Sequence, residues 1–415
     1  MKTNSCRKII SAIALLLPPG LAQAENWNRF RGPNGSGIAE AKTVPAKWSK
    51  DDFRWSVDIR GTGHSSPVVW GKHVVVTSAD KAKGTRFVTC FNTDDGDQVW
   101  QKTVAYKSFK THKNNSQASN TPTVDADGIY VLFQSKVDSP LIAFNHEGDE
   151  LWKFDLGPYL HGQGGGTSPI LCGDMVVVCN DHKTPSFLLA VDRKTGKEIW
   201  KQPREGKRAC YATPCVFRPG NGPDQIVFSH CFEGITGVEA KSGKQIWHVD
   251  VFGTHSQRAV GSPVQFGDLI IANSGGVGGE KNAVAVRITT DGAKAVAKEA
   301  YRFQNSVAPH VPSPIVFDGK LFLWTDQGIV LCADAATGKK LWQARVGGKY
   351  FSSPICVNGM LYNHSVDGEM VVIGTGDTYE LIAKNPIGEF SHASPAVGDG
   401  KLFVRTPSRL IAIGG

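Results

Sequence analysis

One short stretch decides the fold of this chain: Asp192-Arg193-Lys194-Thr195-Gly196-Lys197-Glu198-Ile199-Trp200. It reads as the end of a strand, a glycine turn and a second strand that carries a tryptophan. The pattern recurs from Glu239 to Trp247 and from Asp334 to Trp342, and looser copies end at Trp100 and Trp152. Trp200 and Trp247 are 47 residues apart, and the 95 residues from Trp247 to Trp342 are two periods with one tryptophan lost. The chain is therefore built from repeats, of which the fifth is degenerate.

A second marker runs in step with the first, namely a serine or threonine followed by proline and a β-branched run. Its copies begin at Ser66, Thr121, Ser168, Thr213, Ser262, Ser313, Ser353 and Ser394. From Pro67 to Pro395 there are 328 residues over seven intervals, or about 47 residues per unit. Eight such units account for nearly all of the chain beyond its N-terminal segment.

Each unit reads as four short strands. Two-residue turns such as Gly173-Asp174 and Asp399-Gly400 join the first two strands, and the glycine turn joins the last two. A single sheet of this kind cannot bury both faces, whereas sheets arranged radially cover one another. The sequence therefore predicts an all-β, eight-bladed β-propeller of four-stranded antiparallel blades.

Ring closure gives an independent check on this count. The last unit ends without its tryptophan strand, and Phe53-Arg54-Trp55-Ser56-Val57 has the form of that strand but precedes the first Ser-Pro step. An open ring would expose a sheet edge between the first and last blades. We therefore expect this N-terminal strand to complete the eighth blade and close the ring.

The N-terminus has the features of an export signal. Lys2, Arg7 and Lys8 precede an apolar run from Ile9 to Leu17, which is followed by Ala22-Gln23-Ala24. We expect cleavage after Ala24 and a periplasmic or secreted protein, with a signal peptide over 1–24, a leader segment over 25–52 and the propeller over 53–415. Because Cys6 precedes the apolar run, we expect no lipid anchor, and no other segment suits a membrane span.

Composition and charge exclude several classes of function. With 46 Gly, 22 Pro and 40% apolar residues in 415, the chain is typical of a globular protein with many turns, and disorder and collagen are excluded. The net charge is +8, and loss of the three basic residues of the signal leaves +5. Since this mild excess is not gathered in one stripe, we expect no nucleic-acid partner.

The repeats resemble the quinoprotein-type, or PQQ-like, β-propeller repeat, whose blades carry an Ala-x-Asp-x-x-Thr-Gly-Lys-x-x-Trp motif. The stretch from Ala190 to Trp200 shows it most clearly, and the opening Trp27-Asn28-Arg29-Phe30-Arg31-Gly32-Pro33-Asn34-Gly35-Ser36-Gly37 is similar to the leader of many exported bacterial proteins of this class. The resemblance implies that the tryptophans pack between blades. It also implies one of two functions: a dehydrogenase that holds pyrroloquinoline quinone on the axis, or a non-enzymatic scaffold similar to BamB, which assists outer-membrane protein assembly.

The chemistry of a quinone dehydrogenase finds little support in the sequence. A quinone that accepts a hydride needs a polarising cation, a carboxylate base and a flat apolar slot. The alcohol-oxidising members resemble one another in a bridged pair of adjacent cysteines, which this chain lacks. We therefore predict no catalytic residue, no bound metal and no cofactor, with PQQ and Ca²⁺ kept only for the alternative of a quinone- or metal-dependent oxidoreductase.

The cysteines favour a structural role. None of the eight beyond the signal has the spacing of a zinc or haem motif, and they read as small buried thiols: Cys90, Cys172, Cys179, Cys210, Cys215, Cys231, Cys332 and Cys356. A disulfide stays open in an oxidising compartment, and Cys210 with Cys215 is the first pair to test.

A candidate binding site follows from the topology. In blades of this order, the segments between blades lie on one face, here called the top face, and polar residues precede the Ser/Thr-Pro steps there. They form a candidate ring around the mouth of the channel: His64, Asn120, His161, Arg208, Tyr211, His255, Arg258, His310, Tyr350 and His392. Partly protonated histidines and arginines would favour an anion or an acidic peptide. The alternative is a polar, hydrated mouth whose histidines bond to neighbouring carbonyls.

Taken together, these features favour an exported, non-catalytic binding or scaffold propeller. We expect a monomer with an envelope or secreted protein partner and room for a small anionic ligand. The Lys-rich connection from Lys102 to Lys113 reads either as a solvated loop or as part of a protein-binding surface.

Overall fold

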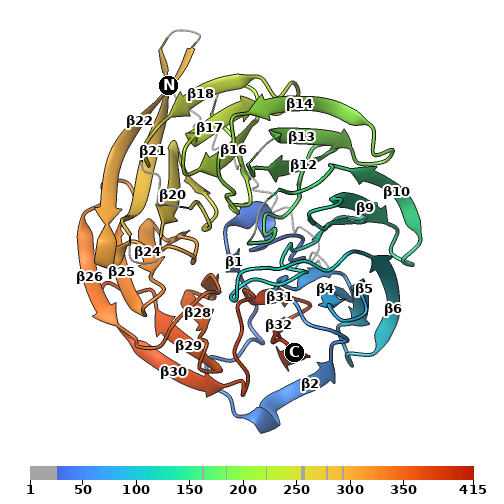
Figure 1. Ribbon diagram of the computed structural model, residues 1–415. Coiled ribbons are helices and arrows are strands. Elements are labelled where there is room, and N and C mark those ends of the chain that lie inside the picture. The colour runs from blue at the N-terminus through green and yellow to red at the C-terminus, as the bar shows by residue number, and fades with distance from the viewer. Residues whose placement is uncertain are drawn as a thin grey trace, which may run out of the picture.

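The computed structural model describes residues 26–160, 163–183, 185–220, 222–253, 258–276, 279–291 and 294–415. Eight antiparallel sheets stand radially around one axis, as Figure 1 shows, which confirms the predicted eight-bladed propeller. The described residues contain no α-helix, and their helical turns are short 3-10 segments: η1 (Pro33–Gly35), η2 (Lys50–Asp52) and η3 (Asn305–Val307). No helix in this part of the chain has the length and apolar character needed to cross a bilayer.

The first four blades follow one another along the chain, each running from the axis outward. Blade 1 holds β3 (Val68–Trp70), β4 (His73–Asp80), β5 (Thr85–Asn92) and β6 (Gln98–Ala105). Blade 2 holds β7 (Thr123–Val124), β8 (Ile129–Leu132), β9 (Pro140–Phe144) and β10 (Glu150–Asp155). Blade 3 holds β11 (Ile170–Cys172), β12 (Met175–Asn180), β13 (Ser186–Asp192) and β14 (Glu198–Arg204). Blade 4 holds β15 (Cys215–Phe217), β16 (Gln225–His230), β17 (Gly234–Glu239) and β18 (Gln245–Val249).

The remaining blades complete the circle, and two of them include strands from the N-terminal segment. Blade 5 holds β19 (Val264–Phe266), β20 (Leu269–Gly275), β21 (Lys281–Asp291) and β22 (Lys294–Gln304). Blade 6 holds β23 (Ile315–Phe317), β24 (Lys320–Trp324), β25 (Ile329–Asp334) and β26 (Lys340–Arg345). Blade 7 joins β1 (Ile38–Ala39) to β27 (Ile355–Val357), β28 (Met360–His364), β29 (Glu369–Gly374) and β30 (Leu381–Pro386). Blade 8 joins β31 (Ala396–Gly398), β32 (Lys401–Arg405) and β33 (Arg409–Gly414) to β2 (Phe53–Asp58).

The closing strand lies where the sequence predicts it. Strand β2 pairs antiparallel with β33, so that Trp55 lies opposite Ala412 and Val57 opposite Leu410. In Figure 1 the blue β2 completes the blade formed by the red strands of the chain end. The N-terminal strand β2 is thus hydrogen-bonded to β33, the last strand of the chain. The ring is closed between blade 8 and blade 1.

The Ser/Thr-Pro steps form a closed circle of hydrogen bonds around the axis. The backbone N–H of each serine or threonine donates to the side-chain hydroxyl of the equivalent residue in the next blade, and the eighth bond, from Ser394 to Ser66 Oγ, completes the circle. The eight bonds measure 2.9–3.1 Å. Each buried amide thereby finds an acceptor that its own sheet does not offer, which explains why a hydroxyl side chain recurs in every repeat.

Outer tryptophans link several blades to the next, whereas the indole N–H of Trp247 donates to Gln225 Oε1 of its own blade. The indole N–H of Trp152 donates to Arg193 O at 2.8 Å, and that of Trp200 donates to Ala240 O at 2.9 Å. Trp55 does the same across the closing seam, with Thr93 O at 3.0 Å. In the fifth blade, which lacks the tryptophan, the hydroxyl of Tyr301 donates to Ala335 O at 2.6 Å. The packing between blades that the resemblance implies is therefore confirmed, and tyrosine replaces tryptophan in the degenerate unit.

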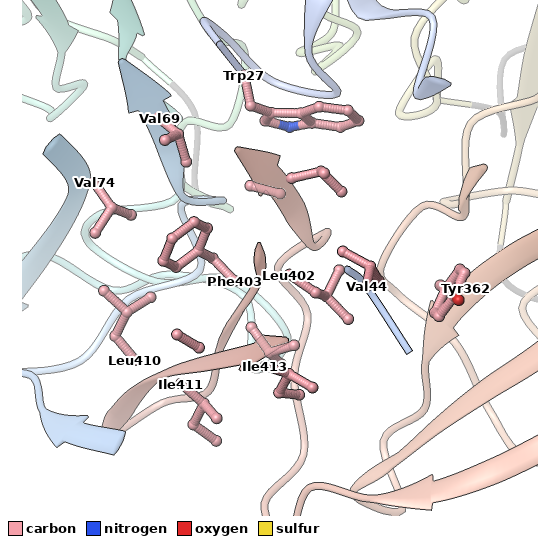
Figure 2. Packing of buried hydrophobic residues seen from close by; sticks show 14 of the residues in the cluster. Trp27, Val44, Val69, Val74, Tyr362, Leu402, Phe403, Leu410, Ile411 and Ile413 are labelled. Carbon is pink, nitrogen blue, oxygen red and sulfur yellow. The ribbon is translucent and has the colours of Figure 1, made fainter. Parts of the chain in front are cut away.

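The N-terminal segment crosses the bottom end of the channel. The backbone of Trp27 pairs with Val69 of blade 1, Asn34 bonds to Val216 of blade 4, and β1 pairs in parallel with β27 of blade 7. Trp27 is only 1% exposed, and Figure 2 shows it packed among residues of the first and last blades, including Val69 and Phe403. The leader, residues 26–52, is thus an integral part of the core.

An ionic network strengthens the seam between blades 8 and 1. Asp399 Oδ2 lies 2.7 Å from Lys401 Nζ and 2.9 Å from Lys72 Nζ, and it accepts a hydrogen bond from Thr93 Oγ1 at 2.9 Å. Burial opposes ionisation of Asp399, but the hydrogen bonds from Lys401, Lys72 and Thr93 outweigh it and lower its pKa to about 2. The charged carboxylate is therefore part of the folded structure over the whole ordinary pH range.

Replacement of Asp399 with asparagine is expected to cost about 2 kcal/mol of unfolding free energy at pH 7, since one pKa unit corresponds to about 1.4 kcal/mol. Asparagine tolerates the left-handed backbone of this position, where φ is 50°. Because the folded pKa lies below the unfolded value, the contribution is complete above about pH 5 and is lost as the pH falls toward 2. Urea unfolding at pH 7 and at about pH 2.5 should show the difference between wild type and variant shrinking at the lower pH. An unchanged difference would contradict the assignment.

Candidate functional site

The structure divides the predicted ring into separate groups. His161 and His255 lie outside the described residues. Of the other eight, His64 and His392 meet at one side of the mouth, and Arg208, Tyr211, Arg258 and His310 lie near one another at another side. Asn120 and Tyr350 are buried, with 4% and 1% of their surface exposed. The eight described positions therefore lie in separate groups, and two of them are buried.

Asn120 and Tyr350 are part of the framework. The amide of Asn120 donates to Thr167 O and to Gln134 Oε1, the latter at 3.1 Å. The ring of Tyr350 packs edge-on against Trp324, with 5.1 Å between centroids. Both side chains connect neighbouring blades, which accounts for polar residues at these positions without a ligand.

A long connection between blades 1 and 2, residues 106–120 and here called the roof loop, lies over the top of the channel. The side-chain amide of Asn115 donates to Gln163 O at 2.7 Å and to Gly165 O at 3.0 Å, on the blade 3 side. On the opposite side, Asn114 O lies 3.2 Å from His392 Nδ1, which belongs to the connection before blade 8. These contacts fix the loop at both sides of the mouth.

The roof loop carries a group of exposed cations. Lys107, Lys110 and Lys113 are exposed, and none of them forms an ion pair within the described part of the chain. The sequence allowed two interpretations of this Lys-rich connection, a solvated loop or part of a protein-binding surface. The first describes the loop incompletely, because Asn114 and Asn115 anchor it to the rest of the top face. The roof loop thus carries three exposed lysines and is held in place by Asn114 and Asn115.

The His64–His392 pair adjoins the roof loop. The two rings lie 4.5 Å apart between centroids, and Phe351 lies 4.7 Å from His392. Burial, His392 and Arg405 together lower the pKa of His64 to about 3, and burial also lowers the pKa of His392. Both imidazoles are therefore neutral near pH 7.

The second group combines arginine and tyrosine from consecutive connections. The hydroxyl of Tyr211 donates to Gln163 Oε1 at 3.2 Å, and its backbone N–H donates to Ala259 O at 2.7 Å. Burial lowers the pKa of Arg258, and the neighbouring Arg208 lowers it further. Arg258 nevertheless remains a cation at neutral pH. Burial also lowers the pKa of His310, against the opposing effect of Asp326. For these described histidines, burial therefore favours the neutral form of the side chain.

A group that the sequence did not single out lies just beneath these arginines: Cys210, His230 and Cys231. The two sulfurs are 3.3 Å apart, and the ligand atoms of all three side chains lie within 4.8 Å of one another. The expectation of Cys210 with Cys215 as the first disulfide candidate is wrong. Cys215 begins β15 on the axis and packs in a different cluster, while Cys231 directly follows β16 and faces Cys210.

The hydrogen bonds of this group place a histidine beside the thiol pair. His230 Nδ1 lies 3.2 Å from the backbone N of Phe232 and 3.1 Å from that of Glu233, and its other ring nitrogen lies 2.9 Å from Arg208 O. The hydrogen bond from Cys210 lowers the pKa of the Cys231 thiol, whereas burial raises that of Cys210. Cys210 is therefore held as a thiol, and Cys231 has increased thiolate character.

Mild oxidation is expected to link Cys210 to Cys231, since their 3.3 Å separation needs only a small shift to reach the bond length of about 2.05 Å. One oxidised glutathione would take up the two electrons and two protons and leave as two reduced molecules. Peptide mapping after alkylation should find the 210–231 link in the wild type and lose it in Cys231→Ser. A link between Cys210 and Cys215 would contradict this geometry.

The one group of three metal-ligating side chains within the described ranges consists of two thiols and an imidazole, whereas calcium takes oxygen ligands. The leader crosses the lower channel, and two hollows of 460 and 450 Å³ open on the bottom face, along Phe266 and Phe317 and around Glu40.

Two further residues escaped the reasoning from sequence. Arg29 and Arg31 of the leader lie buried in the lower channel, with 3% and 0% of their surface exposed. In the sequence, Arg29 and Arg31 stand on either side of Phe30 and are followed by turn residues, but this pattern indicates only a leader segment.

Comparison with known proteins agrees with the architecture. A family model described as outer membrane protein assembly factor BamB matches residues 54–213, 186–315 and 231–414. No individually curated protein matches the chain. BamB from Moraxella catarrhalis has a similar structure, with 14% identity and a TM-score of 0.60 over 86% of this chain and 97% of that one.

Two enzymes are similar to the same extent. Quinohemoprotein alcohol dehydrogenase from Comamonas testosteroni has 12% identity and a TM-score of 0.63 over 95% of this chain and 81% of its own. Quinohemoprotein alcohol dehydrogenase ADHIIG from Pseudomonas putida HK5 has 12% identity and a TM-score of 0.65, covering 94% and 80%. At such identities these likenesses show the fold alone. The family model, in contrast, matches nearly the whole ring, and the chain therefore belongs to the family it describes, the BamB-type PQQ-like β-propellers.

Proposed function

We propose that this chain is an exported, non-catalytic binding propeller whose top face holds an acidic segment of an envelope or secreted protein. Membership of a family described by an assembly factor supports a scaffold role. The charge of the top face supports an acidic partner, because exposed cations in an ordered arrangement attract and orient a complementary surface.

The observation that carries the proposal is the anchored roof loop. Lys107, Lys110 and Lys113 are exposed on this connection of the top face, while Asn114 and Asn115 tie the loop to opposite sides of the mouth. A partner would therefore meet positive charges whose support is already ordered, which reduces the entropy lost on binding.

Charge reversal on the two faces tests the proposal. The variant Lys107→Glu/Lys110→Glu/Lys113→Glu is expected to lose capture of envelope proteins that the wild type retains at low salt. The matched control, Lys197→Glu/Lys244→Glu/Lys339→Glu, places the same charge change on exposed glycine turns between third and fourth strands, away from the roof loop, and should keep capture. Equal loss in both variants, or capture that does not weaken with salt, would contradict a top-face site.

The alternative is a quinone-dependent oxidoreductase, which the similarity to quinohemoprotein alcohol dehydrogenases keeps in consideration. Purified protein supplied with PQQ and Ca²⁺ is expected to show no dye reduction with alcohols or sugars. Turnover under these conditions would overturn the non-catalytic assignment. Export is tested separately, by sequencing the mature N-terminus, which should begin at Glu25.

A further inference from the structure

Two arginines of the leader, Arg29 and Arg31, are buried close to each other in the lower channel. Nη2 of Arg29 donates to Pro214 O at 2.6 Å, and Nη2 of Arg31 lies 3.5 Å from Ser36 O. The Nε and Nη1 groups of both side chains are buried and find no acceptor among the described residues. Four N–H-bearing atoms of two neighbouring cations are thus left without a partner.

Other buried arginines among the described residues have more partners. Arg405 forms no ion pair in these ranges, but it donates to Ser65 O, Ser65 Oγ and Thr406 O. Arg204 lies 3.0 Å from the carboxylate of Asp181. Arg86 donates to the carbonyls of Gln117 and Gln134 and lies over the ring of Tyr106, 4.3 Å from its centroid. Arg29 and Arg31 have neither a carboxylate nor an aromatic face within the described ranges.

Arg29 and Arg31 do not lose their positive charge by deprotonation near pH 7. Burial lowers the pKa of Arg29 to about 10, and burial with the neighbouring Arg29 lowers that of Arg31 to about 9, so both remain cations near pH 7. Burial of an unpaired ion in a medium of low polarity costs several kcal/mol, which a folded protein avoids by a counterion.

The backbone of the leader is shaped around the two guanidinium groups. Arg31 itself has a left-handed backbone, with φ 61°, and the turn that follows contains Gly35 and Gly37 with φ 68° and 76°. A Cβ atom at Gly37 would lie 2.7 Å from Arg31 Nη2, and one at Gly35 would lie 3.3 Å from Arg29 Nη2. The glycines therefore leave room that any larger residue would take from the arginines.

We propose that the lower channel holds a small inorganic anion between Arg29 and Arg31. Both side chains are almost completely buried, and their unpartnered N–H groups supply the hydrogen bonds of the anion. Since Arg29 also reaches Pro214 of blade 4, the anion couples the leader to the ring. This site is separate from the top face and does not depend on the function proposed there.

Bromide identifies the site directly in the unaltered protein. Crystals grown in sodium bromide should show an anomalous peak within hydrogen-bond distance of both guanidinium groups. Ordered water alone at this position, without a bromide peak, would overturn the proposal, as would a peak that contacts only surface lysines.

Thermal unfolding provides a second measurement in solution. At equal ionic strength, bromide or phosphate should raise the Tm of the wild type by at least about 2 °C relative to gluconate, a larger anion. Arg29→Met and Arg31→Met should lose this increase, while Arg54→Met, at an exposed position of β2, should keep it. An equal response in all proteins would show a general salt effect and would contradict the site. If the leader variants do not fold, the bromide experiment on the wild type decides.

Discussion

Replacement of Trp55 with alanine is expected to lower the free energy of unfolding by about 3–5 kcal/mol, the range for removal of a large buried aromatic side chain. Trp55 lies in the closing strand β2, is only 8% exposed and contacts the ring of Phe403 at 5.8 Å between centroids. Its indole N–H donates to Thr93 O of blade 1 at 3.0 Å. The substitution therefore removes packing within blade 8 and a bond across the seam at the same time.

Urea unfolding of wild type, Trp55→Ala and Trp55→Phe separates these contributions. Phenylalanine keeps much of the aromatic area and loses the N–H donor, so its cost should be smaller, about 1–2 kcal/mol. Hydrogen exchange should accelerate first in β2 and β33, since their pairing closes the ring. A loss below about 1 kcal/mol for Trp55→Ala would show that the seam does not depend on this side chain.

Most of the fold could be predicted because each repeat carries its own contacts to the next. The Ser/Thr-Pro steps recur at the hydroxyl circle, and the tryptophans recur where their indoles reach the following blade. A contact made once per blade must appear in the sequence with the period of the blade, so counting markers counts blades. The closing strand was predictable for the same reason. The eighth unit lacked its fourth strand, and the strand around Trp55 preceded the first complete unit.

Features that occur only once were beyond this reasoning. The substitution of Tyr301 for the fifth tryptophan preserves the bond to the next blade with a different donor, and a search for tryptophan misses it. The roof loop brings Asn114 to His392, 278 residues further along the chain, through a contact that no other connection repeats. Periodicity carries no information on such contacts.

The candidate site was predicted less well than the fold because its residues depend on burial and on neighbours. The rings of His64 and His392 lie against each other, and burial lowers the pKa of both imidazoles. Sequence proximity favoured Cys215 as the partner of Cys210, whereas strand topology brings Cys231 to it from the end of β16. Side-chain charge and thiol pairing are tertiary properties, so the repeat pattern alone does not determine them.

Replacement of Gly196 with alanine is expected to lower the free energy of unfolding by about 2–5 kcal/mol, from two separate causes. The position has φ 68°, which is strained for alanine by about 1–2 kcal/mol. Its Cβ would also lie 2.6 Å from the Trp152 indole, which packs against this turn while its N–H donates to Arg193 O. Overpacking of this kind adds about 1–3 kcal/mol.

Gly173→Ala is the matched control that separates the two causes. Gly173 also has a left-handed backbone, with φ 57°, but a Cβ there would meet no atom within 4 Å. Its substitution should therefore cost only the backbone term, about 1–2 kcal/mol. In urea unfolding, the excess loss of Gly196→Ala over Gly173→Ala measures the contact between the glycine turn and the tryptophan of the preceding blade. Because this contact recurs at Gly96 with Trp55 and at Gly243 with Trp200, equal losses in the two variants would remove the physical reason for glycine in the repeat.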